Sequence, residues 1–510
     1  MPPDRDRPEP KLDVAIVASE GVPFAKTGGL ADVVGSLPRA LERLGHRAAV
    51  FLPAHRSARV AAPHLRSTGV DLAIPVGSRL VEGTILAAEL PGSTVPVYLI
   101  DQPGYFDRDQ IYGRDGVDYR DNCERFIFFG RAVLEAIRQL GLKVDVIHCN
   151  DWQTGLIPAY VDEMYRGLSR FANVGTLLTI HNMAYQGTFW HWDVPLTGFD
   201  WRLFNWRQLE HHGRLNFLKA GLAFADRLNT VSPTYAAEIQ TSTYGCGLDD
   251  LLRGRRADLS GIVNGIDPTA WDPAIDPHLA TNYDIRTAAV GKAACKAELQ
   301  RRASLPERPG TPVLAQIGRL AVQKGWDLLV EVADDLLKGD VQLVVLGEGH
   351  AAYREALDRL AARHPGKIGA FFEFSNPLAH QIEAGADLFL MPSLYEPCGL
   401  NQLFSQAYGT VPIVHATGGL VDTVVDADSS TLADGTATGF AFSEPTAAAL
   451  RGAIDRALML WPDRAAWARI VEAGMRADWS WDRSARAYVG LYEQIRAKRA
   501  TGPGVAPPQS

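Results

Sequence analysis

Residues 387–419, DLFLMPSLYEPCGLNQLFSQAYGTVPIVHATGG, decide the fold class of this chain. The apolar run 388–391 predicts a strand that is buried on both faces. A polar turn with Glu396 follows, then a segment with helical periodicity and a second apolar strand, 411–414, which ends at Gly418-Gly419. In an open parallel sheet, ligands bind over such strand ends. We therefore expect Glu396 at the rim of a cleft.

The composition is that of an ordinary globular protein with a length for two large or about three average domains. The chain has 510 residues, of which 46% are hydrophobic and 22% charged. Its net charge of −8 argues against nucleic acid or an anionic membrane as the main partner. An anionic small substrate remains compatible with this charge, since local basic residues can still build a site.

Cysteine content and the ends of the sequence predict a cytoplasmic location. The five cysteines include no CxxC pair, which favours a reducing compartment and argues against a zinc site. The first residues, MPPDRDRPEPK, are charged and proline-rich and do not resemble a signal peptide. No apolar stretch approaches the about 20 residues that a membrane-spanning helix needs.

The first half of the chain begins with a strand–loop–helix unit that suits an anion. A short apolar strand, 14–18, leads into a loop with Lys26 and the pair Gly28-Gly29, and a helix opens near Asp32. Backbone amides at a helix start, with a lysine beside them, favour negative charge. The alternative is a tight turn with a solvated lysine. The loop is not a Walker loop, because no GK[ST] closes it.

Two further strands end in polar residues. The strand 144–147 precedes Asp151, and the strand 175–180 precedes His181. A lone histidine is more often a packing residue, but two polar ends on neighbouring strands favour a site. The aromatic stretch Phe189–Trp206 follows, and the sequence leaves open whether it is a core layer or a sugar-stacking surface.

The second half repeats the same rhythm after an aperiodic stretch, 244–282, which we interpret as the domain junction. A strand, 313–317, is followed by Arg319, by Lys324-Gly325 and by an amphipathic helix. The predicted fold class is therefore α/β, with two Rossmann-like doubly wound domains facing each other across a deep cleft.

Two other motifs allow competing interpretations. The segment Gly347–Ala352 matches the G-x-G-x-x-[GA] dinucleotide fingerprint after a strand, with Glu373 near the next strand end, so an NAD-dependent enzyme is an alternative. It leaves the basic loops and Glu396 unexplained. The D-x-D triplets at 107–109 and 426–428 could suggest a metal-bound nucleotide sugar, but solvated loops fit them better.

Taken together, five motifs occur in one order: KTGGLAD (26–32), TIHN (179–182), NGID (264–267), GRL (318–320) with KG (324–325), and EPCGL (396–400). This set resembles the bacterial glycogen synthases and plant starch synthases over residues 12 to 498. The resemblance implies transfer of glucose from a nucleotide sugar to the non-reducing end of an α-1,4-glucan, with retention at the anomeric carbon.

The resemblance also implies a domain plan. An N-terminal Rossmann-like domain on the acceptor side is expected at 12–265, and a C-terminal one on the nucleotide-sugar side at 266–480. A helix at 481–500 is expected to pack back on the first domain. Disordered ends are expected at 1–11 and 501–510.

By the same resemblance, Lys26 and the amides of Gly28 and Gly29 would meet the distal phosphate and the acceptor side. Arg319 and Lys324 would bind the diphosphate, and His181 would meet the sugar near its 6-hydroxyl. Glu396 would hold the sugar hydroxyls. The expected catalytic residues are thus Lys26, His181, Arg319, Lys324 and Glu396, and the expected substrate-binding residues are Gly28, Gly29, Asp32, Asp151, Asn264, Phe374, Cys398, Gly399 and Leu400.

The chemistry of such a transfer fits these residue types. Loss of a diphosphate builds negative charge on the leaving group, which guanidinium and ammonium groups can stabilise by several kcal/mol. Retaining glycosidases use two carboxylates about 5 Å apart, and no second carboxylate is evident beside Glu396. We therefore favour same-face attack with a phosphate oxygen taking the acceptor's proton, and we expect neither a metal nor a cofactor.

Departures from the family pattern bear on the nucleotide. Leu394 stands where an arginine is usual, and Phe374 and Asn376 replace a tyrosine and a glutamate. Phenylalanine can stack on a base but donates no hydrogen bond. ADP-glucose is the expected donor and an α-1,4-glucan the acceptor. The alternatives are UDP-glucose as donor, a non-catalytic glucan-binding relative, or a sucrose- or trehalose-type synthase, which lacks the KTGGLAD and EPCGL pair.

Overall fold

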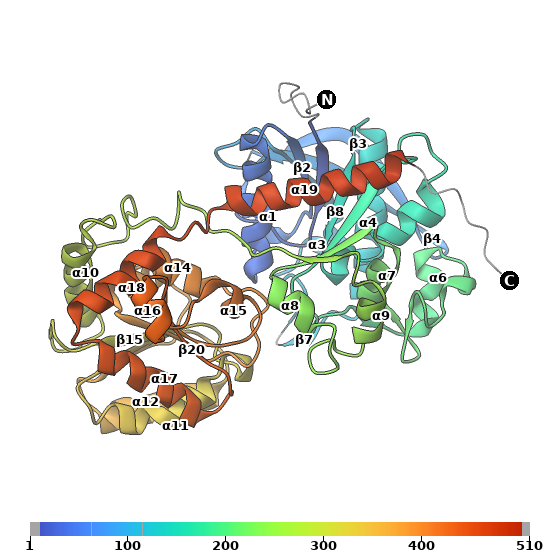
Figure 1. The fold of residues 1–510 in the computed structure, drawn as a ribbon. Helices are drawn as coiled ribbons and strands as arrows, with labels where there is room; N and C mark the ends of the chain where they lie inside the picture. Colours follow the sequence, from blue (N-terminus) through green and yellow to red (C-terminus); the bar gives the residue numbers. More distant parts are fainter. Residues whose placement is uncertain (1–10, 63, 115, 502–510) are drawn as a thin grey trace. The chain divides into compact units, whose positions relative to one another are not determined.

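The computed structural model describes residues 11–62, 64–114 and 116–501. The chain forms two compact units (Figure 1). Unit 1 comprises Met1–Val231, Ala236–Gly265 and Trp481–Ser510, and unit 2 comprises Ser232–Tyr235 and Ile266–Ser480. The predictions of disorder at the two ends concern residues that lie, except for 11 and 501, outside the described part of the chain. Among the described residues, no helix is long and apolar enough to cross a membrane.

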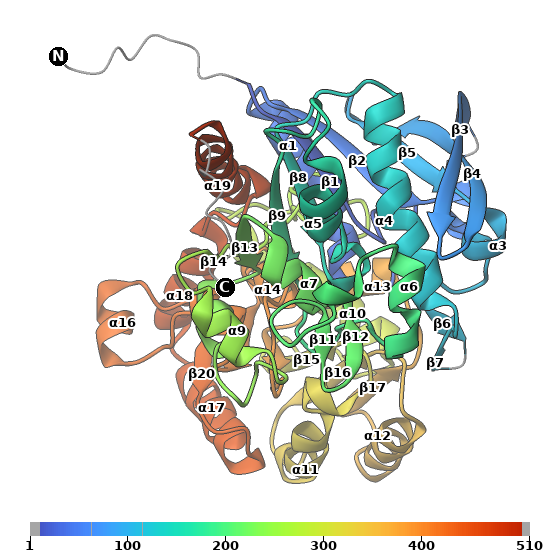
Figure 2. The same cartoon turned by 90° about the vertical axis from the view of Figure 1, so that its right-hand side faces the viewer.

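Unit 1 is built on a sheet of nine strands in its described residues, in the order β14-β13-β9-β8-β1-β2-β5-β4-β3. Seven are parallel: β1 (Asp13–Val17), β2 (Arg47–Pro53), β5 (Pro96–Asp101), β8 (Val146–Asn150), β9 (Gly175–Ile180), β13 (Arg227–Thr230) and β14 (Leu259–Gly261). The antiparallel hairpin β3 (Arg66–Val76) and β4 (Arg79–Glu89) extends one edge of the sheet (Figure 2).

Helices cover both faces of this sheet. On one face, α1 (Gly29–Arg43) lies beside the C-terminal helix α19 (Trp481–Ala500), as the resemblance implies (Figure 1). The Oη of Tyr492 on α19 lies 2.8 Å from Nδ1 of the buried His148 on β8. On the other face pack α4 (Asn122–Gln139), α5 (Ile157–Tyr160) and α7 (Phe217–Phe224). Smaller elements of unit 1 are α2 (Arg56–Ala61), α3 (Pro103–Phe106), β6 (Gly113–Arg114), β7 (Val117–Asp118), β10 (Thr188–Phe189), α6 (Val194–Thr197), β11 (Glu210–His211), β12 (Arg214–Asn216) and α9 (Asp249–Gly254).

Unit 2 has a parallel sheet of six strands in its described residues, in the order β17-β16-β15-β18-β19-β20. The strands are β15 (Val313–Ile317), β16 (Gln342–Leu346), β17 (Ile368–Phe371), β18 (Leu388–Met391), β19 (Val411–His415) and β20 (Phe440–Phe442). Alternate residues of β18 enter different cores: Leu388 and Leu390 face one apolar cluster, and Phe389 and Met391 face the other. Both faces of β18 are therefore buried, as its continuous apolar run predicts.

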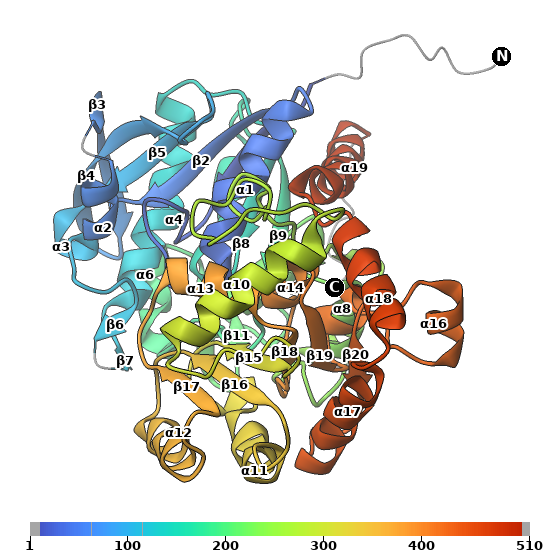
Figure 3. The same ribbon diagram turned by 90° about the vertical axis from the view of Figure 1, so that its left-hand side faces the viewer.

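The helices of unit 2 form two layers around this sheet. Figure 3 shows α10 (Ala288–Arg302) crossing one face, where it packs with α13 (Asn376–Gly385). The other face carries α11 (Trp326–Leu336), α12 (Ala351–Arg363) and α17 (Ala447–Leu460). The remaining helices are α8 (Pro233–Glu238), whose first residues belong to unit 2, and α14 (Asn401–Ala407), α15 (Gly419–Thr423), α16 (Ser429–Asp434) and α18 (Arg464–Arg476).

Each sheet has one point at which the strand order reverses. In unit 1 the chain moves from β1 to β2 and β5 on one side and returns to β8 on the other side of β1. In unit 2 it moves from β15 to β16 and β17 and returns to β18 on the other side of β15. Doubly wound proteins bind ligands outside the carboxyl ends of the two strands at such a reversal.

Most of the strands expected from the sequence are confirmed. The strands 175–180, 313–317 and 388–391 have the predicted bounds, whereas the strand predicted at 144–147 runs from Val146 to Asn150 and the helix expected to open near Asp32 begins at Gly29. The aperiodic stretch 244–282, which we interpreted as the domain junction, contains the boundary between the two units at Gly265 and Ile266, and it also contains α9 and the edge strand β14. Both are too short to show a clear hydrophobic period, and β14 is only half-buried.

Candidate functional site

In unit 2, the loops after β15 and β18 bring a lysine and a carboxylate together. Lys324 Nζ donates to Glu396 Oε2 at 2.5 Å, and the Ser393 hydroxyl lies 3.0 Å from the same oxygen. The Glu396 side chain is 9% exposed and that of Lys324 24%, so the pair is largely shielded from water. The two residues predicted to hold the diphosphate and the sugar are therefore direct partners at the strand reversal of unit 2.

Backbone contacts between the same two loops fix this pair. The Leu394 amide donates to the Gln323 carbonyl at 2.8 Å, and Gln323 Nε2 donates to the Tyr395 carbonyl at 3.2 Å. Gly325 has a φ of 67°, and a Cβ at that position would lie 2.0 Å from the Pro392 carbonyl oxygen. Only glycine fits this close approach, which explains the Lys-Gly pair in the sequence.

Arg319 follows β15 on an exposed loop. Its carbonyl accepts a hydrogen bond from Trp326 Nε1 at 2.7 Å, while its guanidinium has no hydrogen-bond or ion-pair partner among the described residues. Phe374, which follows β17, is 81% exposed. A cation and a flat ring thus face solvent in the loops that follow β15 and β17 of the unit 2 sheet.

The turn after Glu396 packs against the glycine pair that ends β19. The Gly419 amide donates to the Glu396 carbonyl at 3.1 Å. A Cβ on Gly418 would lie 2.1 Å from that carbonyl oxygen, and one on Gly419 would lie 2.2 Å from the Cys398 carbonyl oxygen. Gly399 has a φ of 74°, and Leu400 immediately precedes α14. The predicted residues 398–400 therefore form a rigid turn below Glu396.

In unit 1, the glycine loop after β1 is already bonded to a carboxylate of the protein. Glu20 Oε2 accepts hydrogen bonds from the Thr27 amide and, at 3.1 Å, from the Gly28 amide, while Tyr112 Oη donates to Oε1 at 2.5 Å. Glu20 is only 4% exposed. The preference of these amides for an anion is therefore met in part by Glu20, and this carboxylate fixes the loop.

Lys26 and Asp32 form an ion pair at the start of α1, with 2.7 Å between Nζ and Oδ1. Their side chains are 45% and 36% exposed, so solvent screens the pair. The Gly29 amide opens the same helix. The structure thus places Lys26, Gly28, Gly29 and Asp32 together, at the carboxyl end of β1.

His181 contacts the end of the neighbouring strand β8. Its Nε2 lies 2.9 Å from Asn150 Oδ1, and Asn150 Nδ2 lies 3.1 Å from the Val17 carbonyl and 3.3 Å from the His148 carbonyl. Carbonyl oxygens only accept hydrogen bonds, so the amide NH2 must face them and Oδ1 must face the histidine. Nε2 of His181 therefore carries a proton.

Burial lowers the pKa of His181 to about 3, so the ring is neutral near pH 7. With the proton fixed on Nε2, Nδ1 has a lone pair and can accept a hydrogen bond. A neutral imidazole that accepts through Nδ1 suits the hydroxyl of an uncharged sugar better than it suits a phosphate.

Asp151 closes the turn between β8 and η1 (Trp152–Thr154). Its φ of 57° is in the left-handed region, and its Oδ1 accepts the His181 amide at 2.7 Å. Burial raises the pKa of Asp151 to about 7, although the backbone bonds from His181 and Asn182 act in the opposite direction. This carboxyl holds the backbone of His181, and its protonation changes near neutral pH.

Asn264 lies just beyond β14, and it is 5% exposed. Its Oδ1 is buried and has no hydrogen-bond partner among the described residues. A buried polar atom without a partner costs about 1–3 kcal/mol unless a water or a ligand satisfies it. This side chain belongs to unit 1, at the same edge of the sheet as Asp151 and His181.

The glycines of the dinucleotide-like motif serve packing within unit 2. A Cβ on Gly347 would lie 1.9 Å from the Gly318 carbonyl oxygen, and the Leu320 amide donates to the Glu348 carbonyl at 2.7 Å. The His350 amide donates to the Leu320 carbonyl at 2.8 Å. These backbone groups bind the loop that carries Arg319, so the motif positions that loop and does not indicate an NAD site.

Both D-x-D triplets have structural partners. Asp107 and Asp109 form ion pairs with Arg56, and Asp426 pairs with Arg456 at 2.8 Å. Asp428 caps α16 through the amides of residues 430 and 431. In the described part of the chain, no group of three or more His, Cys, Asp or Glu side chains is placed to hold a metal ion.

Four residues that join the predicted ones were not predicted as site residues: Glu20, Tyr112, Asn150 and Ser393. Glu20 and Asn150 each lie at a strand end, three residues after β1 and at the last position of β8, and this position is a usable signal. Tyr112 is 92 residues from Glu20 in the sequence, and no local pattern could have joined them.

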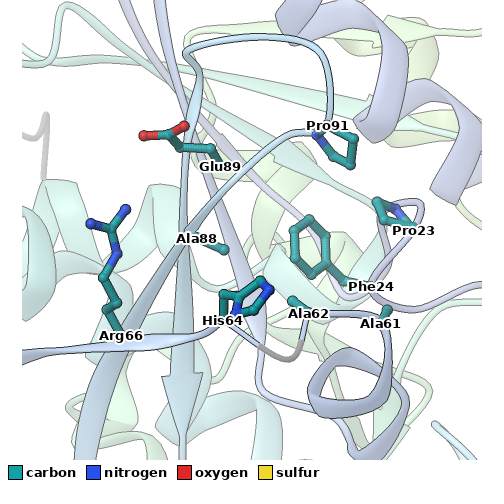
Figure 4. A pocket seen from close by; sticks show the side chains of 9 residues that line it. All are labelled: Pro23, Phe24, Ala61, Ala62, His64, Arg66, Ala88, Glu89 and Pro91. Atoms are coloured by element: carbon teal, nitrogen blue, oxygen red, sulfur yellow. The ribbon is translucent and has the colours of Figure 1, made fainter.

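A separate pocket in unit 1 is lined by none of the predicted site residues. Figure 4 shows Phe24 and Pro23 beside two alanines, with Glu89 and Arg66 on the strands of the β3–β4 hairpin. Its lining residues are Pro23, Phe24, Ala61, Ala62, His64, Arg66, Ala88, Glu89 and Pro91. The charged groups of this pocket are few and of both signs, and they give it no evident chemistry.

Comparison with protein families gives two matches that together cover most of the chain. Residues 13–254 match the starch synthase catalytic domain, and residues 298–473 match the group 1 glycosyl transferases. Among curated relatives, a glycogen synthase of Rhodopirellula baltica is 45% identical over 506 residues, which is 96% of this chain and 100% of the relative. A glycogen synthase of Anaeromyxobacter dehalogenans is 49% identical over 490 residues, again 96% of this chain and 100% of the relative.

Solved structures agree with these matches. The catalytic domain of starch synthase IV from Arabidopsis thaliana, bound to ADP and acarbose, has a TM-score of 0.87 and 32% identity, covering 96% of this chain and 100% of that one. A sucrose-phosphate synthase from Thermosynechococcus elongatus has a TM-score of 0.60 at 18% identity, over 96% of this chain and 100% of that one, and shares the fold alone.

Proposed function

The chain belongs to the glycogen and starch synthase family of glycosyltransferases, and we propose that it transfers glucose from ADP-glucose to the non-reducing end of an α-1,4-glucan with retention of configuration. The observation that carries this proposal is the shielded Lys324–Glu396 pair at the strand reversal of unit 2, with the exposed Arg319 beside it in the chain. A cation next to a carboxylate matches the two halves of a nucleotide sugar: a diphosphate and a set of hydroxyls.

In this proposal, Arg319 and Lys324 stabilise the diphosphate as it leaves. The bond between the anomeric carbon and the diphosphate oxygen breaks, and negative charge grows on that oxygen. Arg319 offers a fork of N–H donors and Lys324 a point charge, and such preorganised groups act most strongly on the charge that develops in the transition state. Glu396 accepts hydrogen bonds from the sugar hydroxyls and offsets the positive charge of the ring.

The acceptor hydroxyl forms the new bond to the anomeric carbon on the face that the diphosphate leaves, and its proton passes to a diphosphate oxygen. The described partners of the Glu396 carboxylate are Lys324 and Ser393, so no second carboxylate takes the role of a base in this scheme. In unit 1, neutral His181 offers Nδ1 and Asn264 offers Oδ1 as hydrogen-bond acceptors for sugar hydroxyls. Detection of a covalent glucosyl–Glu396 species by mass spectrometry would overturn this mechanism.

ADP-glucose is proposed as the donor because the starch synthase IV structure of high similarity is bound to ADP. Phe374, 81% exposed, offers a ring on which a base can stack, but it has no hydroxyl with which to select adenine. The choice of nucleotide is therefore the part of the proposal that the test must separate from the reaction itself.

The test is incubation of the purified protein with glycogen and labelled ADP-glucose or UDP-glucose, followed by counting of precipitated glucan. Transfer from ADP-glucose at least tenfold faster than from UDP-glucose is expected. Faster transfer from UDP-glucose would contradict the donor, and no transfer from either would contradict the reaction. Lys324→Ala is expected to lower the rate of transfer by orders of magnitude. Its matched control is Lys338→Ala, which removes an exposed lysine that pairs with Asp335.

A further inference from the structure

The aromatic stretch after His181 presents a row of rings to solvent. Trp190, Trp192 and Trp201 are 59%, 58% and 44% exposed. Ring centroids are 6.4 Å apart for Trp190 and Trp192, 5.7 Å for Trp192 and Trp201, and 5.6 Å for Trp201 and Phe204. We call these four residues, the three exposed indoles and the half-buried Phe204, the aromatic row. The rings meet edge to face, with interplanar angles of 66°, 77° and 89°, so they do not form a closed stack.

The same stretch also sends several other aromatic and apolar side chains inward. Phe199 is 6% exposed and stacks on Tyr160 at 4.6 Å, while Leu203 and Leu209 are fully buried. Asp200 caps the 3-10 turn Trp201–Leu203 through the Arg202 amide at 2.7 Å. Other residues of the stretch thus pack into the core, while the three exposed indoles of the aromatic row do not. A cluster of exposed indoles on a fixed backbone is typical of a binding surface.

The charges around the aromatic row suit a neutral ligand. Residues 188–214 contain three acidic residues (Asp193, Asp200, Glu210) and three basic ones (Arg202, Arg207, Arg214), a net charge of zero in a chain of net charge −8. Nucleic acids and anionic membranes need a surplus of basic groups. Glucose rings are neutral and have apolar faces that cover an indole, and a glucan repeats such rings along its length.

The aromatic row is also continuous with the unit 1 site. Phe189, which directly precedes Trp190, lies 5.8 Å from the Trp152 ring, and Trp152 follows Asp151. Gly187 packs so closely on Trp152 that a Cβ there would lie 2.2 Å from the indole. The backbone that carries the aromatic row is therefore fixed against the strand end that carries Asp151.

We propose that Trp190, Trp192, Trp201 and Phe204 form an extended surface that holds an α-1,4-glucan chain outside the reacting position. This inference rests on the proposed function, because the glucan is its acceptor. A chain held along the aromatic row stays near the site between successive transfers. Long or branched acceptors then gain affinity from the row, whereas a short acceptor does not reach it.

The test compares Trp190→Ala/Trp192→Ala with the wild type in native gels that contain increasing glycogen. Each stacking ring contributes a factor of about three to ten in affinity, so the double variant is expected to need about tenfold to a hundredfold more glycogen for half-maximal retardation. Transfer of glucose to maltotriose and the melting temperature are expected to stay unchanged. Unchanged retardation, or an equal loss of maltotriose transfer, would overturn the proposal.

Two controls and one milder variant complete the design. Trp206 is 69% exposed but lies outside the aromatic row, with its ring 5.0 Å from the Arg207 guanidinium, and Met459 in unit 2 is 81% exposed. Trp206→Ala and Met459→Ala should therefore retard normally. If the double alanine variant unfolds, Trp190→Phe/Trp192→Phe must still show weaker retardation, with normal retardation counting against the proposal.

Retardation by glycogen needs no nucleotide-sugar donor, so the experiment can contradict the binding surface and the proposed function independently. Glycogen binding that depends on the aromatic row, without transfer from either nucleotide sugar, would contradict the proposed function and leave the binding surface. Sedimentation of the protein without glycogen tests whether the exposed indoles instead form a contact between copies of the chain. Self-association that the double variant abolishes, with retardation unchanged, would identify the aromatic row as a contact between copies of the chain.

Discussion

Replacement of Glu396 by glutamine separates the charge of this side chain from its shape. Glutamine keeps an oxygen that can accept from Lys324 Nζ and the Ser393 hydroxyl, which lie 2.5 and 3.0 Å from Oε2 in the wild type. It loses the negative charge. We expect Glu396→Gln to fold, to bind ADP at least as well as the wild type, and to transfer glucose far more slowly.

The magnitude follows from the bonds that change strength. A hydrogen bond to a charged group contributes about 1.5–3 kcal/mol and a neutral one about 0.5–1.5 kcal/mol, so two sugar hydroxyls lose about 2–3 kcal/mol in total. At about 1.4 kcal/mol per factor of ten, kcat should fall by about 30-fold to 150-fold. In the folded state, the hydrogen bond from Lys324 becomes weaker by a similar amount, but a carboxylate that is 9% exposed is no longer buried. The two effects oppose each other, so the free energy of unfolding should change by about 1 kcal/mol.

The assay combines labelled transfer to glycogen, calorimetric titration with ADP and thermal unfolding. ADP affinity is the diagnostic quantity, because Lys324 loses its negatively charged partner in Glu396→Gln and is itself absent in Lys324→Ala. The first variant should bind ADP equally or more tightly, and the second should bind it more weakly. Normal turnover in Glu396→Gln, or parallel losses of ADP affinity in both variants, would refute the roles assigned to the pair.

Three further predictions concern buried groups. In Asn150→Leu, His181 Nε2–H has no acceptor, so 15N spectra of labelled histidine should show a mixture of tautomers and transfer should fall at least about tenfold; a single Nε2–H tautomer would contradict this. Burial raises the pKa of Glu383 to about 8, so the free energy of unfolding of the wild type falls as pH rises from about 4.5 to 8. Over this range, the free energy of unfolding of Glu383→Gln relative to that of the wild type should rise by up to about 1.4 kcal/mol per pH unit in urea unfolding. A difference between the two proteins that is constant with pH would refute the shift. Tyr492→Phe leaves Nδ1 of buried His148 unpaired and should lower the free energy of unfolding by about 1–3 kcal/mol, with an unchanged value showing that α19 is held by other contacts.

The parts of the fold that sequence reasoning recovered are those whose signal is local. The strand 388–391 is a continuous apolar run because both of its faces enter a core, and the close approach of Gly418 to the Glu396 carbonyl requires glycine. The hairpin of β3 and β4 was not foreseen, since many of its residues are exposed and its pairing with β5 joins distant segments.

The partners of the site residues could not be predicted from the sequence, because most of these contacts also join distant segments of the chain. In the sequence, Lys26 and Lys324 each lie near a glycine and show no evident partner. In the structure, Lys26 pairs with Asp32 and Lys324 pairs with Glu396. The first pair is six residues apart and could have been suspected, while the second spans 72 residues and depends on the order of the strands. Asn150 was not predicted as a site residue because it acts through His181, which it orients by a hydrogen bond.

These pairings change what the basic residues can do for a diphosphate. Part of the positive charge of Lys324 is offset by Glu396, and the Gly28 amide is bonded to Glu20, whereas the Arg319 guanidinium has no partner in the described part of the chain. A phosphate that approaches unit 2 therefore meets full, uncompensated charge first at Arg319. In the proposed mechanism, contact of a phosphate with Lys324 would draw this lysine away from Glu396 and release a carboxylate oxygen for the sugar. The proposed mechanism therefore predicts that binding of the diphosphate and holding of the sugar are coupled through the one hydrogen bond between Lys324 and Glu396.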